Sequence, residues 1–349
     1  MTSFEFSRLQ SGKTVYWLTR KTLQKRLALM LPDIDMNEVV TVTAELSGNA
    51  SFVNYVRHHT LTHLPSGAVL DVVEKSIRKL GFVSSLEASF YRERHLFADS
   101  IHFQHPPCHA LIDTPWESLI FIQFVEGKAP HLHAIAEKIA RGIAEIESVS
   151  RQHLRDSSRI QGLKHWRMDF FRLWYLLRPR FNFSRLLPSV RALATQDTRF
   201  AGLEAQLRPF IAQVRENARA AQRSPRCYCH MDYLRKNLFV SEQGLHLIDW
   251  SEVKVGRVGF DGGAYLSAVF RRNNMLRFRQ VSEEFLTAYS QALTDDADRS
   301  LAIANVRYVF LLNSLWYCMR PQTIAEYSRT ENLNELREKF EYLLTLKVV

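Results

Sequence analysis

The sequence predicts an α+β protein with two lobes, a small β-rich lobe at the N-terminus and a larger, mostly helical lobe after it. Two observations carry this prediction. Short segments rich in β-branched and apolar residues, separated by turn residues, occupy much of residues 39–125. From residue 131 onward apolar residues recur at helical spacing, with one short β segment among them. We therefore divide the chain into an N-terminal lobe, residues 1–127, and a C-terminal lobe, residues 128–349, with a crevice expected near Gly127.

The N-terminal lobe is predicted to begin with a helical leader over residues 1–35, because residues 21–31 carry a helix-period pattern. Three segments typical of strands follow, at residues 39–43, 52–56 and 68–73. Ser84 and Ser85 are suitable N-caps for a helix through residues 86–91. Residues 118–125 are an apolar run that predicts a buried strand.

The C-terminal lobe begins with a clear helical pattern. Residues 133–147 place an apolar residue on one helix face at each turn. Residues 238–240 and 245–248 predict a hairpin, and helices resume after Gly259. The longest apolar stretch, residues 301–319, contains Asn305, Arg307 and Asn313, which a lipid-spanning helix would rarely tolerate. We expect a buried helix there.

Composition is that of an ordinary globular protein of 349 residues, with 46% hydrophobic and 23% charged residues. The first residues show no basic stretch followed by an apolar run, so we expect no secretory signal and a cytoplasmic protein. The four cysteines fit a reducing compartment. Cys227, Cys229 and His230 suggest a zinc site, but further ligands at suitable spacing are not obvious, and core cysteines are the favoured interpretation.

The net charge of +10 is partly concentrated in residues 164–180, where aromatic and basic residues alternate. Such a stretch is typical of a basic amphipathic helix that contacts an anionic membrane surface. The alternative, which we favour, is a helix packed on the large lobe by its aromatic side chains, with its arginines in water. No nucleic-acid-binding motif accompanies the charge, so nucleic acid is not an expected partner.

Between residues 230 and 250 the chain supplies an Asp, an Asn and a second Asp at a spacing that fits phosphoryl transfer. Asp232 would accept the proton of a substrate hydroxyl. Asn237 offers a neutral amide oxygen, and Asp249 ends an apolar strand that can hold its carboxylate rigidly. Oxygen ligands of this kind suit Mg²⁺ beside phosphates.

These residues resemble a known family, the aminoglycoside phosphotransferase and choline kinase-like superfamily. The resemblance is carried by His230-x-Asp232-x(4)-Asn237, by Ile248-Asp249-Trp250 and by the Gly-Phe-Asp-Gly-Gly-Ala of residues 259–264. The resemblance implies a protein-kinase-like fold. It also implies an enzyme that phosphorylates hydroxyl groups of small molecules with ATP and Mg²⁺. By position, it implies Asp232 as catalytic base, Asn237 and Asp249 as Mg²⁺ ligands, His230 as a packing residue and Asp261 as a structural acid.

The same resemblance extends to the N-terminal lobe. It implies these nucleotide contacts: Ser47, Gly48 and Asn49 in a phosphate loop, Lys75 on the α- and β-phosphates, Glu87 as the partner of that lysine, and Gln123 and Val125 in a hinge that receives adenine. Lys79 competes with Lys75 for its role, and Glu93 competes with Glu87.

The leading interpretation is an ATP- and Mg²⁺-dependent phosphotransferase that acts on a hydroxyl of a sugar, another metabolite or a lipid headgroup. Because residues 151–225 are rich in arginine, a neutral or anionic acceptor is favoured over a cationic one. Two alternatives stay open. An atypical protein kinase is one, although no Ala-Pro-Glu-like anchor follows Asp249 and Trp250 replaces the usual Phe-Gly. A non-catalytic pseudokinase or basic membrane-docking module is the other, although Lys75, Asp232, Asn237 and Asp249 are all present.

Overall fold

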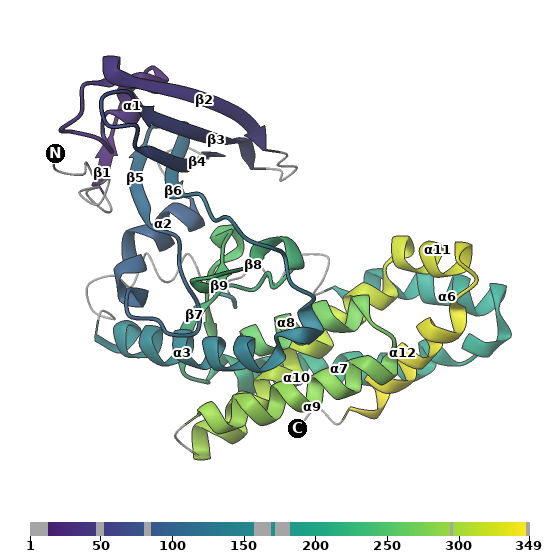
Figure 1. Ribbon diagram of the computed structural model, residues 1–349. Helices are drawn as coiled ribbons and strands as arrows, with labels where there is room; N and C mark the ends of the chain where they lie inside the picture. The colour runs from purple at the N-terminus through teal and green to yellow at the C-terminus, as the bar shows by residue number, and fades with distance from the viewer. Residues whose placement is uncertain are drawn as a thin grey trace. The chain divides into compact units, whose positions relative to one another are not determined.

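The computed structural model describes residues 13–46, 52–79, 85–156, 169–171, 182–293 and 296–346. The chain forms two compact units. Unit 1 comprises Met1–Asp99, Gln104–Lys128 and Phe239–Ser251, and unit 2 comprises Ser100–Phe103, Ala129–Leu238 and Glu252–Val349. The α+β, protein-kinase-like fold class predicted from the sequence is confirmed, with a β-sheet in the N-terminal region and mostly helices in the C-terminal part (Figure 1).

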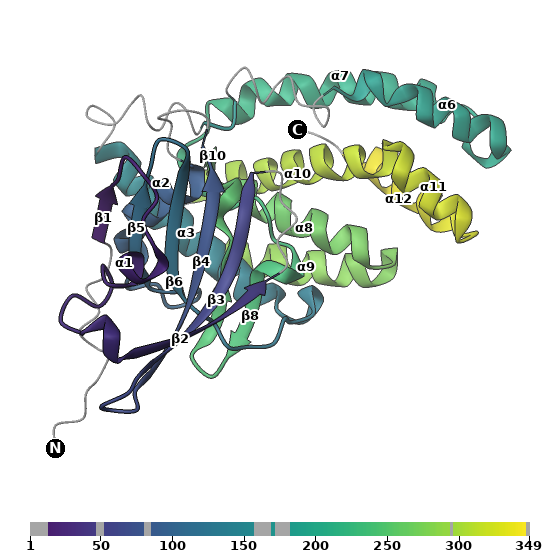
Figure 2. The same ribbon diagram turned by 90° about the horizontal axis from the view of Figure 1, so that it is seen from above.

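Unit 1 is built on a six-stranded sheet with the order β1-β5-β6-β4-β3-β2 (Figure 2). The strands are β1 (Lys13–Tyr16), β2 (Val39–Leu46), β3 (Val53–His63), β4 (Val69–Arg78), β5 (Cys108–Asp113) and β6 (Glu117–Gln123). All neighbours pair antiparallel except β1 and β5, which are parallel. The four segments predicted as strands correspond to β2, β3, β4 and β6, where β-branched residues pack on the sheet.

The helical leader predicted for residues 1–35 is wrong over Lys13–Tyr16, which form β1. The pairing of β1 with β5 satisfies backbone groups of both strands, and this tertiary hydrogen bonding outweighs a weak local preference. Among residues 13–35, which the structure describes, the α-helix is α1 (Leu23–Leu27), capped by Thr22, whose side chain accepts from the N–H of Lys25. Strand β5 was not predicted.

The two faces of the sheet are covered by different helices. Glu74 and Lys75 are consecutive in β4 and therefore point to opposite faces. Glu74 forms a buried ion pair of 2.9 Å with Arg26 of α1, whereas Lys75 lies 2.8 Å from Glu87 of α2 (Leu86–Glu93). Helix α1 and helix α2 thus lie on opposite sides of β4. The core on the α1 side consists of Leu27, Met30, Leu31, Leu61, Leu70, Val72, Ala110, Ile112, Leu119 and Phe121.

The predicted hairpin is present as β8 (Leu238–Ser241) and β9 (Gly244–Leu247). It is attached to unit 1 by backbone hydrogen bonds at two places. Gln104 bonds to Leu245 and Leu247, and Lys128 exchanges two bonds of 3.0 and 2.9 Å with Val240. The end of β9 is thereby fixed to Gln104, which precedes β5, and β8 is fixed to Lys128, which follows β6.

Unit 2 consists mainly of helices, which are α3 (Ala136–Asp156), α6 (Leu187–Gln196), α7 (Leu203–Gln222), α8 (Phe260–Arg272), α9 (Met275–Ala292), α10 (Asp296–Met319), α11 (Pro321–Arg329) and α12 (Leu333–Thr345). A small antiparallel sheet joins β7 (Arg226–Cys229) to β10 (Lys254–Arg257). Helix α8 packs closely on α10 (Figure 1). A Cβ at Gly263 would lie 2.6 Å from the carbonyl oxygen of Val306, so glycine is what permits this approach.

The apolar stretch at residues 301–319 lies in α10, a buried helix as predicted. The amide of Asn305 donates to the carbonyl of Val258 over 2.8 Å, and Asn313 is buried as well. In the described part of the chain, no helix combines the length and apolar character that crossing a bilayer requires.

All four cysteines, Cys108, Cys227, Cys229 and Cys318, are buried and reduced. Burial raises the pKa of the Cys108 and Cys318 thiols to about 12. Of the basic stretch 164–180, only residues 169–171 belong to the described residues; the loop with Ser47, Gly48 and Asn49 also lies outside them.

Gly259, the N-cap of α8, tests how tightly the start of this helix is packed, and Gly202, the N-cap of α7, serves as the control. Gly259 and Gly202 both adopt a left-handed backbone, with φ of +86° and +79°. A Cβ at Gly259 would overlap the carbonyl of Ala302, whereas a Cβ at Gly202 would meet open space. We expect Gly259→Ala to lower the free energy of unfolding by at least about 3 kcal/mol, and Gly202→Ala by only about 1 kcal/mol. Urea denaturation of the two variants measures the difference, and equal losses would contradict the close packing.

Candidate active site

Three charged side chains predicted to serve the nucleotide meet within unit 1. The Nζ of Lys75 lies 2.8 Å from the carboxylate of Glu87 and 2.6 Å from that of Asp249. The side chains are 11%, 2% and 24% exposed in that order. Lys75 therefore contacts Glu87 and not Glu93. The competing Lys79 has other partners, because its Nζ lies 3.2 Å from Asp113 and 3.0 Å from the carbonyl of Thr114.

Two carboxylates share one lysine in this cluster, which sets its electrostatics. Burial alone would lower the pKa of Lys75, but the charges of Glu87 and Asp249 outweigh it and raise that pKa above its usual value. Burial raises the pKa of Glu87, although the positive charge of Lys75 acts to lower it. The ammonium group is thus firmly protonated, and Glu87 depends on it for compensation of its buried charge.

Aromatic stacking fixes Asp249 relative to α2. Trp250 is fully buried and stacks on Phe90 with a centroid distance of 3.7 Å and an interplanar angle of 8°. The backbone N–H of Trp250 also donates to Glu87. Asp249 itself has a left-handed backbone, with φ of +62°, which Asp tolerates better than most residues. The carboxylate therefore turns out of the strand direction of β9 and reaches Lys75.

The predicted hinge follows β6. The N–H of Gln123 donates to Pro107 and the N–H of Phe124 donates to Asp71, over 2.8 and 3.0 Å. The side chain of Gln123 donates to the same carbonyl of Asp71 over 2.9 Å. The N–H of Val125 has no hydrogen-bond partner among the described residues. Of the two residues expected at the adenine, Val125 is the one with a donor to offer.

In unit 2, Asp261 holds the loop that carries Asp232. This buried carboxylate accepts from the N–H groups of His230 and Met231, both over 2.8 Å, and from the hydroxyl of Tyr233 over 3.0 Å. Burial raises the pKa of Asp261, and the three donors act in the opposite direction. These contacts agree with a structural role for Asp261, which is the role that the resemblance implies.

Asp232 is oriented by its own loop. Its N–H donates to Nδ1 of the buried His230 over 3.2 Å, and the intervening Met231 has a left-handed backbone with φ of +66°. The amide Nδ2 of Asn237 donates to both the carbonyl and the carboxylate of Asp232, each over 2.9 Å. The Oδ1 of Asn237 has no donor among the described residues, so this oxygen is available as a metal ligand.

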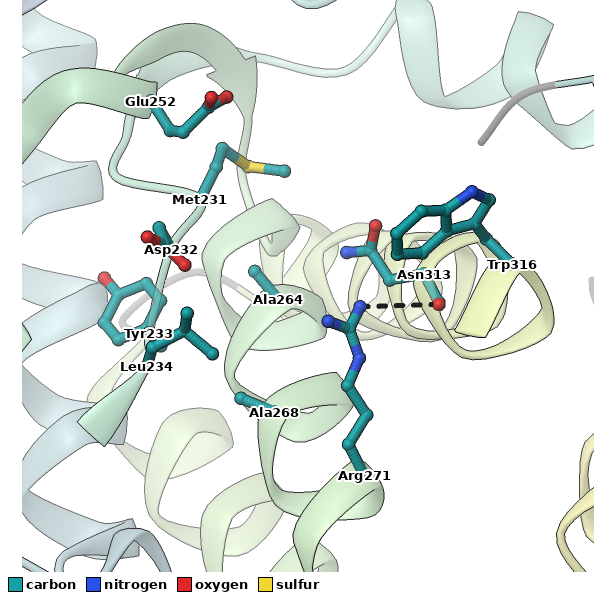
Figure 3. Close-up of a pocket in the computed structure, with 10 residues that line it drawn as sticks. All are labelled: Met231, Asp232, Tyr233, Leu234, Glu252, Ala264, Ala268, Arg271, Asn313 and Trp316. Carbon is teal, nitrogen blue, oxygen red and sulfur yellow. Dashed lines mark hydrogen bonds between the residues drawn. The ribbon is translucent and has the colours of Figure 1, made fainter. Parts of the chain in front are cut away.

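Asp232 opens on a pocket of about 240 Å³ within unit 2 (Figure 3). The pocket is lined by Met231, Asp232, Tyr233, Leu234, Glu252, Ala264, Ala268, Arg271, Asn313 and Trp316. Ala264, Ala268 and Arg271 come from α8, and Asn313 and Trp316 come from α10. The small side chains of the two alanines leave room beside the Asp232 loop (Figure 3).

Arg271, Asn313 and Trp316 were not predicted as site residues. They lie 39 or more positions from Asp232 in the sequence, and only the packing of α8 on α10 brings them to its pocket. One signal was present: Asn313 interrupts the longest apolar stretch, where an amide needs a partner or a ligand.

The fold of the chain is protein-kinase-like. The model of the phosphotransferase enzyme family matches residues 87–302, and the chain belongs to this family. This membership confirms the resemblance to the aminoglycoside phosphotransferase and choline kinase-like superfamily. No curated protein sequence matches the chain.

Many solved structures are similar in fold, among them two small-molecule kinases. Choline kinase from Cryptosporidium parvum Iowa II has a TM-score of 0.52 and 12% identity, over 92% of this chain and 96% of that one. Amicoumacin kinase hAmiN, solved in complex with AMP-PNP, Ca²⁺ and Ami, has a TM-score of 0.55 and 13% identity, over 93% and 94%.

The zinc interpretation of Cys227, Cys229 and His230 receives no support. The two thiols lie 3.7 Å apart in the buried strand β7. Within the described ranges, no group of three or more His, Cys, Asp or Glu side chains is arranged to hold a metal ion.

Replacing Lys75 tests the buried charge cluster in the absence of any ligand. We expect Lys75→Met to lower the free energy of unfolding by about 3 kcal/mol, because Glu87 loses its counter-charge. The folded-state pKa of Glu87 then rises further above its unfolded value, so the folded protein binds the extra proton. Stability should fall as pH rises between these two pKa values, and the loss should be larger at about pH 8 than at about pH 5.

The measurement is urea denaturation at both pH values. The double variant Lys75→Met/Glu87→Gln removes both charges and should recover most of the loss at the higher pH. If the loss in the free energy of unfolding does not depend on pH, or if the double variant does not recover it, Lys75 does not compensate the charge of Glu87.

Proposed function

We propose that this protein transfers the γ-phosphoryl group of ATP to a hydroxyl of a small molecule, with Mg²⁺ as cofactor. One observation carries the proposal: the carboxylate of Asp232, held by Asn237 and by a loop clamped on Asp261, lines a pocket of about 240 Å³. An acceptor in that pocket has its hydroxyl beside a fixed proton acceptor. A concave pocket of this size suits a small molecule better than a protein segment.

The reaction itself is an in-line displacement. The acceptor oxygen forms a bond to the γ-phosphorus while the bond from that phosphorus to the β,γ-bridging oxygen breaks, and ADP leaves. The hydroxyl proton passes to the carboxylate of Asp232. Catalysis consists mainly of positioning, since Asp232 is already oriented by Asn237 and by the N–H bond to His230.

The nucleotide would be held by groups of unit 1. Lys75 would donate to the α- and β-phosphates while its bond to Glu87 keeps it in place. Lys75 also contacts Oδ1 of Asp249 over 2.6 Å, and a carboxylate has a second oxygen that can coordinate a metal ion. The free N–H of Val125 is a suitable donor to the adenine ring.

The oxygen donors fit Mg²⁺. Asn237 presents an Oδ1 that accepts no bond from the described residues, and Asp249 presents a carboxylate just after β9; oxygens of this kind are the hard ligands that this ion prefers. When bound, Mg²⁺ neutralises charge on the β- and γ-phosphates. The joint action of Asn237 and Asp249 on one ion remains a prediction from the sequence.

The role of Asp232 is tested by Asp232→Asn, which keeps the shape and removes the base. We expect kcat to fall about 100- to 10,000-fold while the affinity for Mg²⁺·AMP-PNP changes less than about threefold. The assay is ATP consumption with Mg²⁺ across a panel of hydroxyl-bearing metabolites, with calorimetry for the nucleotide. Unchanged turnover would remove Asp232 as base.

Asp249→Ala tests the metal ligand. It should weaken binding of Mg²⁺·AMP-PNP at least about tenfold and also remove most activity, because Asp249 acts on the nucleotide before the chemical step. Glu242→Gln is the matched control, since Glu242 is an exposed acid in the turn of the same hairpin. Similar affinities in both variants, measured by calorimetry with Mg²⁺ present, would refute the assignment.

A further inference from the structure

We infer that the acceptor carries an anionic group, a phosphate or a carboxylate, and that Arg271 binds this group at the end of the pocket contributed by α8 and α10. The inference rests on the proposed function in that it places the acceptor hydroxyl at Asp232. It goes further by naming the chemical class of the acceptor and the residue that selects it.

Arg271 is a cation that forms no ion pair among the described residues, although the carboxylate of Asp232 attracts it without direct contact. Its guanidinium lines the pocket and makes one long contact of 3.5 Å to the carbonyl of Asn313 (Figure 3). Its Nε is buried and has no hydrogen-bond partner. In the part of the chain that the structure describes, no carboxylate forms an ion pair with it. A buried or half-buried guanidinium is costly without an anion, so the missing partner points to a ligand.

A second arginine lies on the same aromatic rings. The guanidinium carbons of Arg271 and Arg320 are 5.8 and 5.1 Å from the ring of Trp316 and 5.4 and 5.1 Å from the ring of Tyr317. Burial, together with the nearby Arg320, lowers the pKa of Arg271 to about 10. The two cations repel each other and lie on the same ring faces, Arg320 also donates to the hydroxyl of Thr323, and neither forms an ion pair with an acid among the described residues. An anion between them and the Asp232 loop would relieve this repulsion.

Asn313 supplies a third polar group at the same place. Its side chain lines the pocket, comes from the otherwise apolar α10 and has no hydrogen-bond partner among the described residues. Phosphate and carboxylate oxygens accept from both guanidinium and amide N–H groups. The Nε of Arg271 and the side-chain amide of Asn313 are thus two donors that no acceptor among the described residues satisfies.

The acids that line the pocket are already engaged. Glu252 lies 2.7 Å from the Nζ of the buried Lys254, which balances its charge. Asp232 accepts from Asn237 and lies at the opposite side of the pocket from the arginine (Figure 3). An acceptor that places an anionic group at Arg271 and a hydroxyl at Asp232 is complementary to both sides of the pocket. A polycationic acceptor would place positive charge against Arg271 and Arg320.

The size of the pocket restricts the acceptor further. A volume of about 240 Å³ is below the roughly 300–1,000 Å³ of sites for drug-sized ligands. The class we infer is therefore a small hydroxyl compound with one anionic substituent, such as a sugar phosphate, a polyol phosphate or a hydroxy acid.

The test compares three proteins: wild type, Arg271→Gln, and Arg272→Gln as the control. Arg272 is the next residue of α8 and is exposed, so its variant has the same change of charge outside the pocket. Matched acceptors are offered with Mg²⁺·ATP: neutral polyols and sugars, their monophosphates, the corresponding hydroxy acids, and amino sugars. The monophosphates and hydroxy acids separate a phosphate from a carboxylate as the recognised group.

We expect wild type to use at least one anionic acceptor with a kcat/KM at least tenfold above that of its neutral counterpart. In Arg271→Gln that preference should fall about 10- to 100-fold, mainly through KM, while turnover of neutral acceptors changes less than about threefold. Arg272→Gln should behave as wild type. A preference for neutral or cationic acceptors, or equal effects of the two variants, overturns the inference.

Titration with inorganic phosphate, in the presence of Mg²⁺·ADP, separates failure of this inference from failure of the proposed function. Phosphate binding that is lost in Arg271→Gln and kept in Arg272→Gln supports the anion site even if no acceptor is phosphorylated. Phosphate binding unaffected by Arg271→Gln overturns it. Arg271→Lys, which keeps the charge but loses the planar fork, replaces Arg271→Gln if the latter fails to fold and should weaken phosphate binding less than tenfold.

Discussion

The carboxylate of Asp261 accepts three hydrogen bonds, from His230, Met231 and Tyr233, and the candidate active site of unit 2 depends on these bonds. A loop that places Met231 in a left-handed conformation is strained and needs an external hold. Asp261 supplies it from the first turn of α8, which itself starts at Gly259 against α10. The packing of α8 on α10 thus determines both the position of the proposed base and the wall of its pocket.

In unit 1 the charged side chains are positioned by contacts between separate elements. Lys75 comes from the sheet, Glu87 from α2 and Asp249 from the end of β9, and no local turn relates them. The stacking of Trp250 on Phe90 joins the last two elements, and strand pairing fixes the first. In both units a buried aromatic or acidic residue next to the functional group does the positioning, while the functional group itself stays partly accessible.

Features encoded by local pattern were predictable from the sequence. The hairpin of β8 and β9, strands β2, β3, β4 and β6 and the buried α10 follow from periodicity and turn residues, and the Lys75–Glu87 contact followed from the resemblance. Features that depend on distant partners were not. Strand β1 is a strand through its pairing with β5, far along the chain, and Arg271 becomes a pocket residue only through the packing of α8 on α10. The sequence alone does not show whether a carboxylate lies next to Arg271 in the folded protein.

The burial of all four cysteines has a practical consequence for spectroscopy. Because thiolates react with maleimides and burial raises the pKa of these thiols, the native cysteines should remain unmodified under mild labelling. A cysteine introduced on an exposed helix face, for example beside α12, would then carry a fluorophore or spin label alone. The protein can accordingly be studied as a singly labelled molecule without first removing any of its own sulfur atoms.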